Sequence, residues 1–191
     1  MPKRVFYRRF PPRRKRIGIT DYRLRLKLVK SGLPRVVVRR SNRYMTIQIV
    51  ESRPGGDRTL LTVTSKLLSS YGWKAGTKNI PAAYLTGLIA GKKAVEMGIT
   101  KAIADIGRYS PVPGSRVFAA IKGVIDAGLE VPMSEAAAPT DERLRGEHIS
   151  AYYQSLPHDG TTFQFSLLAS EIMSSLPRHV EEVKSKILSG S

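Results

Sequence analysis

The chain has 191 residues, of which 41% are hydrophobic, so it can form one ordinary domain with extensions and is not disordered overall. It contains no cysteine, which excludes a disulfide framework, thiol catalysis and cysteine-bound zinc, and which agrees with a cytoplasmic protein. No apolar run approaches the roughly 18 residues of a membrane span, and none follows the basic N-terminus, so we expect neither a membrane helix nor a signal peptide.

The formal net charge is +17, and most of it lies in the N-terminal part of the chain. Residues 1–43 hold sixteen Lys or Arg and one acid, Asp21, a net charge of +15, whereas the other 148 residues carry only +2. Three prolines discourage a membrane-binding amphipathic helix within residues 1–16. Arginines with interleaved aromatic residues are typical of nucleic-acid binding, because both side chains stack on bases and guanidinium groups bind phosphates. We therefore expect the arm to bind nucleic acid rather than a membrane.

The segment after the arm predicts a helix followed by three strands. A helix over 21–30, capped by Thr20, would rest on protein and turn a basic face to RNA. Alternating apolar residues predict strands over 35–40, 45–51 and 58–65, with turn residues between them. The spacing indicates an antiparallel meander.

The pattern then changes to helices around one more strand. We expect a helix over 80–97 with Asn79 as its cap, a buried strand over 102–106 and a second helix over 115–128. Small residues at helical spacing in the first helix would let it lie close on a sheet; they are Ala83, Gly87, Ala90, Gly91 and Ala94. The order of elements indicates an α/β fold, with a mixed three-to-four-stranded sheet packed by two helices.

The C-terminal part predicts a linker and short helices. Residues 132–140 have the composition of a linker, and helices are expected over 141–155, 162–175 and 178–188. From Thr140 on, five basic residues stand against seven acidic ones, so this part is better suited to packing on protein than to anchoring RNA. We therefore divide the chain into a basic arm and helix (1–33), an α/β core (34–131) and a linker with a helical extension (132–191).

Residues with catalytic potential do not form a recognisable set. His148, His158 and His179 fall in no metal-binding or nucleophile motif. The segment 87–93 (GLIAGKK) lacks the spacing and the hydroxyl residue of a phosphate-binding loop, so we expect Lys92 and Lys93 on an exposed helix edge, with Lys92 able to pair with Glu96. Asp105 has no basic partner nearby in the sequence and is expected to hydrogen-bond a neighbouring loop or helix end. We expect no enzyme and no cofactor.

Two further features leave their role open. Trp73, the only tryptophan, can stack on a base or close the edge of the core. The loop 107–116 (GRYSPVPGSR) is basic, aromatic and rich in Gly and Pro, which suits RNA contact nearly as well as it suits an ordinary surface loop.

The chain resembles the archaeal form of large-subunit ribosomal protein eighteen, the 5S rRNA-binding family whose eukaryotic relatives are called ribosomal protein five. The resemblance rests on segments such as GWK at 72–74 and NIPAAYLTG at 79–87, which occur in family order over roughly residues 15–153. The matching segments are 20–28, 34–42, 72–74, 79–87, 90–94, 104–107, 114–120, 126–129 and 143–149.

The resemblance implies a structural protein of the large ribosomal subunit in the cytoplasm. It implies 5S rRNA as the main partner, with contacts to the large (23S-type) rRNA and to neighbouring proteins of the central protuberance, including the other 5S-binding protein. It implies no small-molecule substrate.

Charge and resemblance together predict the RNA-binding residues. The arm and first helix supply Arg4, Arg8, Arg9, Arg13, Arg14, Lys15, Arg16, Tyr22, Arg23, Arg25 and Lys27. The core supplies Arg39, Ser41, Asn42, Arg43, Trp73, Lys74, Asn79, Lys92, Lys93, Arg108 and Arg116.

Overall fold

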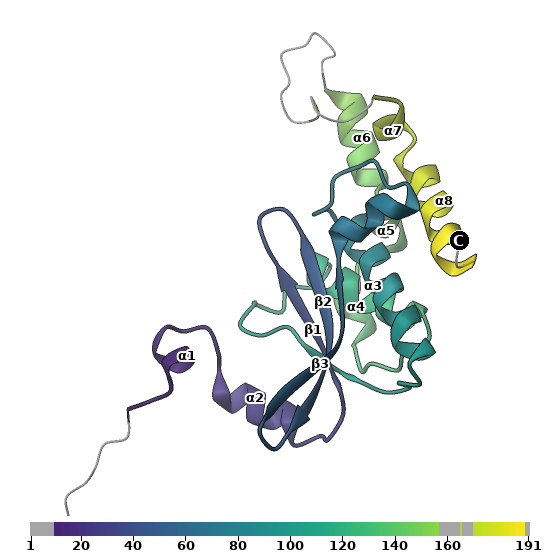
Figure 1. Ribbon diagram of the computed structural model, residues 1–191. Coiled ribbons are helices and arrows are strands. Elements are labelled where there is room, and N and C mark those ends of the chain that lie inside the picture. The colour runs from purple at the N-terminus through teal and green to yellow at the C-terminus, as the bar shows by residue number, and fades with distance from the viewer. Residues whose placement is uncertain (1–9, 157–164, 166–169, 190–191) are drawn as a thin grey trace, which may run out of the picture.

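The computed structural model describes residues 10–156, Phe165 and residues 170–189. A four-stranded mixed sheet forms its centre (Figure 1), built from β1 (Arg35–Arg40), β2 (Met45–Arg53), β3 (Gly56–Thr64) and β4 (Ile103–Asp105) in the order β3-β2-β1-β4. The β1–β2 and β2–β3 pairs are antiparallel and β1–β4 is parallel. The predicted meander and the mixed sheet are confirmed; β2 extends two residues further and β3 begins two residues earlier than expected.

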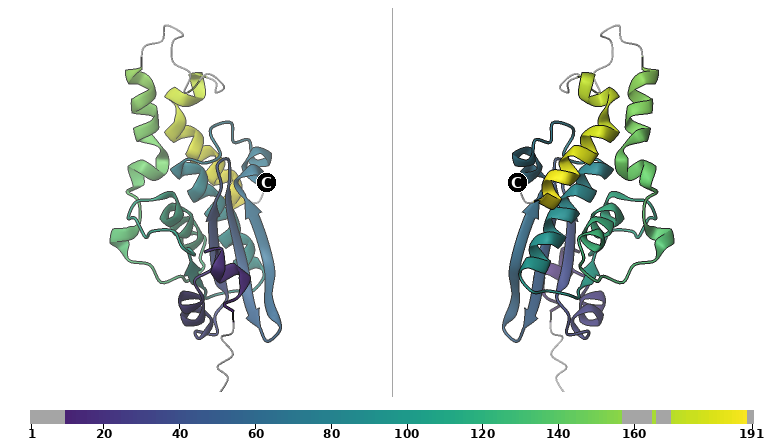
Figure 2. Two further views of the ribbon diagram at one scale, coloured as in Figure 1. Left: turned by 90° about the vertical axis from the view of Figure 1, so that its left-hand side faces the viewer. Right: turned by 90° about the vertical axis from the view of Figure 1, so that its right-hand side faces the viewer.

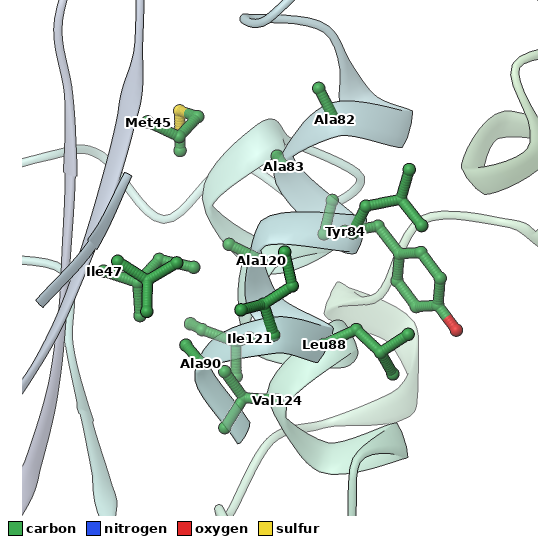
Figure 3. Close-up of a cluster of buried hydrophobic side chains, with 14 of the residues drawn as sticks. Met45, Ile47, Ala82, Ala83, Tyr84, Leu88, Ala90, Ala120, Ile121 and Val124 are labelled. Carbon is green, nitrogen blue, oxygen red and sulfur yellow. The ribbon is translucent and has the colours of Figure 1, made fainter. Parts of the chain in front are cut away.

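Two helices cover one face of the sheet. They are α3 (Ile80–Glu96) and α4 (Arg116–Asp126), both predicted within one or two residues. Asn79 caps α3 as expected, because its Oδ1 accepts a 2.9 Å hydrogen bond from the Ala82 amide. Figure 3 shows Met45 and Ile47 of β2 facing side chains of both helices, and all of these belong to one hydrophobic core.

The small-residue stripe of α3 acts differently from the prediction. A Cβ at Gly87 would lie 2.0 Å from the Ala120 carbonyl oxygen, and one at Gly91 would lie 2.7 Å from the Val124 carbonyl oxygen. Gly123 of α4 makes the reciprocal close approach, 2.1 Å from the Tyr84 carbonyl oxygen. The glycines therefore let the backbones of α3 and α4 approach each other, a helix–helix contact that the prediction did not include.

The C-terminal part begins with short helical segments. After the 3₁₀ turn η2 (Glu135–Ala137), the helix expected over 141–155 is divided at Gly146 into α5 (Asp141–Arg145) and α6 (Glu147–Ser155). Gly146 has φ +82°, and a Cβ there would come within 3.0 Å of both Leu176 and Pro81. The positive φ and the tight packing explain why the helix changes direction at this residue.

The last helices pack onto the core. Of the helix predicted over 162–175, α7 (Ser170–Ser174) forms and Ser175 is a turn; residues 162–164 and 166–169 lie outside the described residues. Helix α8 (Leu176–Ser189) matches the prediction and buries Leu176, Val180, Val183 and Ile187. Figure 2 shows α6 and α8 side by side beyond one end of the sheet. Because these residues share one cluster with the sheet, the extension adds to the central core.

Two short elements precede the sheet on its other side. They are α1 (Arg13–Arg16) and α2 (Tyr22–Val29), at the purple end of the ribbon in Figure 1. The 3₁₀ helix η1 (Ser65–Tyr71) joins β3 to the loop that leads into α3.

Candidate RNA interface

The basic arm is exposed wherever it is described. Arg4, Arg8 and Arg9 lie outside the described residues. The next four residues form α1, a single turn that follows Pro12, so the prediction that prolines discourage a helix throughout 1–16 is wrong for this turn. Proline disfavours the interior of a helix but is tolerated at its start. All four residues are basic and exposed: Arg13, Arg14, Lys15 and Arg16.

Helix α2 continues the basic surface without a buried residue of its own. Asp21 caps it in place of the predicted Thr20, and its carboxylate accepts hydrogen bonds from the Arg23 amide (2.9 Å) and the Leu24 amide (3.3 Å). The hydrogen bonds from the Leu24 and Arg23 amides hold the pKa of Asp21 below its usual range. Arg23 and Lys27 are exposed and Tyr22 is half-buried, so the helix presents two cations to solvent.

Alternating arginines and aspartates connect α2 to the sheet. Arg25 lies 3.0 Å from Asp57 at the start of β3, and Asp57 lies 2.5 Å from Arg35 of β1. Arg35 also binds Asp105 of β4 at 2.9 Å. Burial raises the pKa of Asp57, but the hydrogen bond and charge of Arg35 and the charge of Arg25 outweigh it, so the net shift is downward. These four residues, Arg25, Asp57, Arg35 and Asp105, form an arginine–aspartate chain. It fixes α2 over the face of the sheet that α3 and α4 do not cover.

Arg39 adds a last member to the arginine–aspartate chain, because it also pairs with Asp105. Its guanidinium donates to the Asp105 carboxylate (3.0 Å) and to the backbone oxygens of Asp105 and Val38, both at 2.8 Å. An RNA contact by Arg39, which stays a prediction, would compete with these bonds. Asp105 also accepts from the Gly107 amide at 2.9 Å, which confirms the expected loop hydrogen bond. Its arginine partners were not predicted, because they lie about 70 residues away in the sequence, on β1.

The β1–β2 turn remains a candidate contact. Ser41 accepts hydrogen bonds from the Arg43 amide (3.3 Å) and the Tyr44 amide (2.9 Å), which order the turn. The side chains of Ser41, Asn42 and Arg43 are exposed at the tip of the hairpin. A rigid, exposed turn of this kind can meet RNA with little further loss of chain entropy.

Trp73 closes the edge of the core, which was one of the two roles expected for it; the other was stacking on a base. It is 5% exposed, its Nε1 donates to the Gly76 carbonyl at 3.2 Å, and its ring stacks on His179 of α8 with centroids 5.1 Å apart. A base could stack there only by displacing His179. Lys74 beside it is exposed, and its backbone amide donates to His179 Nε2 at 3.3 Å.

Lys92 has a structural partner that the sequence analysis did not foresee. Its Nζ donates to the Ile187 and Leu188 carbonyls at 2.9 and 3.0 Å, at the C-terminal end of α8. The expected pairing with Glu96 is absent among the described ion pairs. A lysine at this position stabilises α8 by satisfying terminal carbonyls and opposing the negative end of the helix dipole. Lys93, the next residue, is half-buried.

The loop after β4 joins the N-terminal segment to the helical layer. Arg108 donates through Nη1 to the Gly18 carbonyl, and Arg116 donates to the Lys78 carbonyl at 3.1 Å. Arg116 therefore lies next to Asn79 and the start of α3. The structure brings one group of predicted site residues together on the arm and α2 and places Asn79 beside Arg116 at the starts of α3 and α4, whereas Trp73 and Lys92 lie against α8.

The comparisons with known proteins decide the family. The profile described as "Ribosomal large subunit proteins 60S L5, and 50S L18" matches residues 7–101. The protein named large ribosomal subunit protein uL18 from Aeropyrum pernix is 46% identical over 185 residues, which cover 94% of this chain and 86% of that protein. The chain belongs to the uL18 family of large-subunit ribosomal proteins. The resemblance stated from the sequence is confirmed.

Other uL18 proteins match over similar lengths. The Halobacterium salinarum protein is 46% identical over 178 residues, covering 93% of this chain and 94% of that protein, and the Korarchaeum cryptofilum protein is 50% identical over 149 residues, covering 78% and 76%. These relatives are ribosomal proteins rather than enzymes, which confirms the reading of the chain as non-catalytic. No helix in the described part of the chain is long and apolar enough to cross a membrane.

Proposed function

We propose that this member of the uL18 family binds 5S rRNA, helps attach it to the large rRNA, and forms part of the central protuberance of the large subunit. The observation that carries the proposal is the uncompensated charge of the N-terminal region. Six exposed cations of the described arm and α2 have no ion-pair partner among the described residues; they are Arg13, Arg14, Lys15, Arg16, Arg23 and Lys27. A polyanion that neutralises them removes their mutual repulsion.

The proposed division of labour follows the three parts of the chain. Residues 1–33 bind rRNA through charge, and residues 34–131 bind 5S rRNA through rigid turns and helix starts. Residues 132–191 pack on the core and meet neighbouring proteins of the protuberance, among them the other 5S-binding protein. The buried face of α8 supports the packing on the core, because Leu176, Val180, Val183 and Ile187 are used within the chain, while Leu188 stays exposed among polar residues.

The test is binding of the full chain to 5S rRNA and to an unrelated RNA of equal length. We expect nanomolar affinity for 5S rRNA and much weaker binding of the control RNA. If six to ten phosphates are neutralised, the affinity should fall by about 10³ to 10⁵ between 50 and 200 mM salt. Equal affinity for the two RNAs would overturn the proposal of 5S specificity.

A further inference from the structure

A pocket of about 500 Å³ lies where α3 and α4 begin, and its lining contains cations without an acidic residue. It is formed by the end of β1, the loops before both helices, and the α5–α6 segment of the C-terminal extension. The charged and titratable side chains around it are Arg40, Lys78, Arg116, Arg143 and His148. Within the described part of the chain, none of these five is paired with a carboxylate.

Arg40 and Arg116 are held in place by contacts that do not neutralise them, and Arg143 lies close to the loop before α4. The Arg40 guanidinium lies 4.9 Å from the centre of the Tyr109 ring, and the Tyr109 hydroxyl is 3.1 Å from both the amide and the carbonyl of Arg40. Arg116 donates to the Lys78 carbonyl at 3.1 Å. Arg143 Nη1 lies beside Gly114, 3.4 Å from the position a Cβ would take there. Uncompensated cations held this close repel one another, so the pocket is suited to an anion.

The ionisation of the lining agrees with this. Burial lowers the pKa of Arg116, and the nearby charge of Arg40 lowers it further. Burial also lowers the pKa of His148, and Arg143 adds to that effect. At both side chains positive charge is disfavoured, first by burial and then by the neighbouring cation.

Backbone donors of α4 add to the same environment. Ser115 is the N-cap of this eleven-residue helix, and its side chain makes no capping hydrogen bond. The first amides of a helix have no intrahelical acceptor and carry the positive end of the helix dipole. Ser115 and Asn79, the caps of α4 and α3, both line the pocket, so the starts of two helices meet the cation cluster.

We infer that this pocket binds one backbone phosphate of the RNA, and that the C-terminal extension supplies Arg143 and His148 to the site. The inference rests on the proposed function for the identity of the anion as an RNA phosphate. It assigns to residues 132–191 a direct part in binding RNA, which their excess of acidic over basic residues did not predict. Arg143 lies within the matching segment 143–149, but only the fold shows that it faces Gly114 and Arg116.

The first arm of the test uses inorganic phosphate and the full chain. Phosphate replaces chloride at constant ionic strength while the amide NMR signals of residues 115–118 are followed. We expect saturable shifts in the wild type, weakened several-fold in Arg143→Gln and retained in Arg145→Gln. Arg143 is exposed and makes no ion pair in the described structure, so its replacement should not disturb folding. Arg145 is the matched control, because it pairs with Glu181 at 3.7 Å and does not line the pocket.

The second arm measures 5S rRNA binding of the same proteins over a range of salt concentrations. Arg143→Gln should weaken binding by about tenfold and reduce the salt slope by about one, whereas Arg143→Lys should keep the slope. Phosphate-induced shifts with an unchanged RNA slope would mean that the pocket holds a free anion, and would overturn the assignment to RNA. Equal shifts in wild type and Arg143→Gln would overturn the pocket itself. If the wild type bound 5S rRNA no better than the unrelated RNA, the proposed function would be overturned instead.

Discussion

At the residue scale, the buried Arg35–Asp105 ion pair has the largest expected effect on stability. The two side chains are 5% and 8% exposed, and Arg35 shares its other partner, Asp57, with Arg25 of α2. Removing one partner of a buried pair leaves a charge in the interior without its counter-charge. The pair therefore matters for stability and for the position of the arm, although neither residue needs to touch RNA.

Asp105→Asn should lower the free energy of unfolding by up to about 3–5 kcal/mol, because Arg35 loses its buried counter-charge and keeps only the partly exposed Asp57, and Arg39 loses its carboxylate partner. Urea denaturation of the full chain measures this. Glu130→Gln is the control, since its pair with Lys101 is 60–69% exposed and worth at most about 1 kcal/mol. A loss below about 1 kcal/mol in Asp105→Asn would show that the chain of ion pairs does not hold the fold together.

His179 makes the docking of α8 sensitive to pH. Burial lowers its pKa, Glu182 opposes this effect, and Lys186 and Lys74 reinforce it. The unfolded chain then binds a proton more readily than the folded chain, so stability should fall as the pH drops below about 6.5. Urea denaturation between pH 7.5 and 5 should show this fall reduced in His179→Gln. The pKa of His148 is lowered too, so a smaller fall in stability should persist in this variant. If His179→Gln and the wild type lost stability equally over this pH range, the assignment to His179 would be contradicted.

The sequence predicted site residues where a single segment carries the signal. The charge of the arm and the capping role of Asn79 are both local properties of the chain. The partners of Asp105, Lys92 and Trp73 could not be predicted, because each lies on an element about 65 to 106 residues away that is brought close only by folding. Lys92 and Trp73 contact α8 of the C-terminal part, and Asp105 joins two neighbouring strands of the sheet.

At the element scale, the contact between α3 and α4 depends on glycine. Gly87 and Gly123 face each other's helix backbone with room for no side chain. The sequence shows the small residues at helical spacing but does not show which neighbour they meet. The break at Gly146 was missed for a similar reason, since the sequence does not reveal its positive φ or the Leu176 and Pro81 side chains packed against it.

Gly87→Ala should destabilise the protein by about 1–3 kcal/mol or more, because the new methyl group would overlap the Ala120 carbonyl. Thermal unfolding measures the change as a lower Tm. Gly76→Ala is the matched control: the nearest heavy atom to a Cβ there is 3.8 Å away, and Gly76 does not have a positive φ. An unchanged Tm in Gly87→Ala would mean that α3 and α4 can move apart without loss of stability.

At the scale of the whole molecule, the positive charge is concentrated in the N-terminal 43 residues. The arm and α2 lie on one side of the sheet, and the helical layer that carries the pocket lies on the other (Figure 1). The arginine–aspartate chain holds α2 on the sheet, and the Arg108–Gly18 bond joins the N-terminal segment to the loop that leads into α4. An RNA that contacts both regions would meet them in a fixed relative position, which favours binding to one folded RNA over general attraction to any polyanion.

The account is tested most directly by footprinting 5S rRNA with the full chain and with a chain lacking residues 1–19. We expect the full chain to protect one continuous region of 5S rRNA. The shortened chain should bind more weakly and with a smaller salt slope, keeping protection where the core binds and losing it where the arm binds. Identical footprints and affinities for the two chains, or no protection of 5S rRNA by the full chain, would contradict the account.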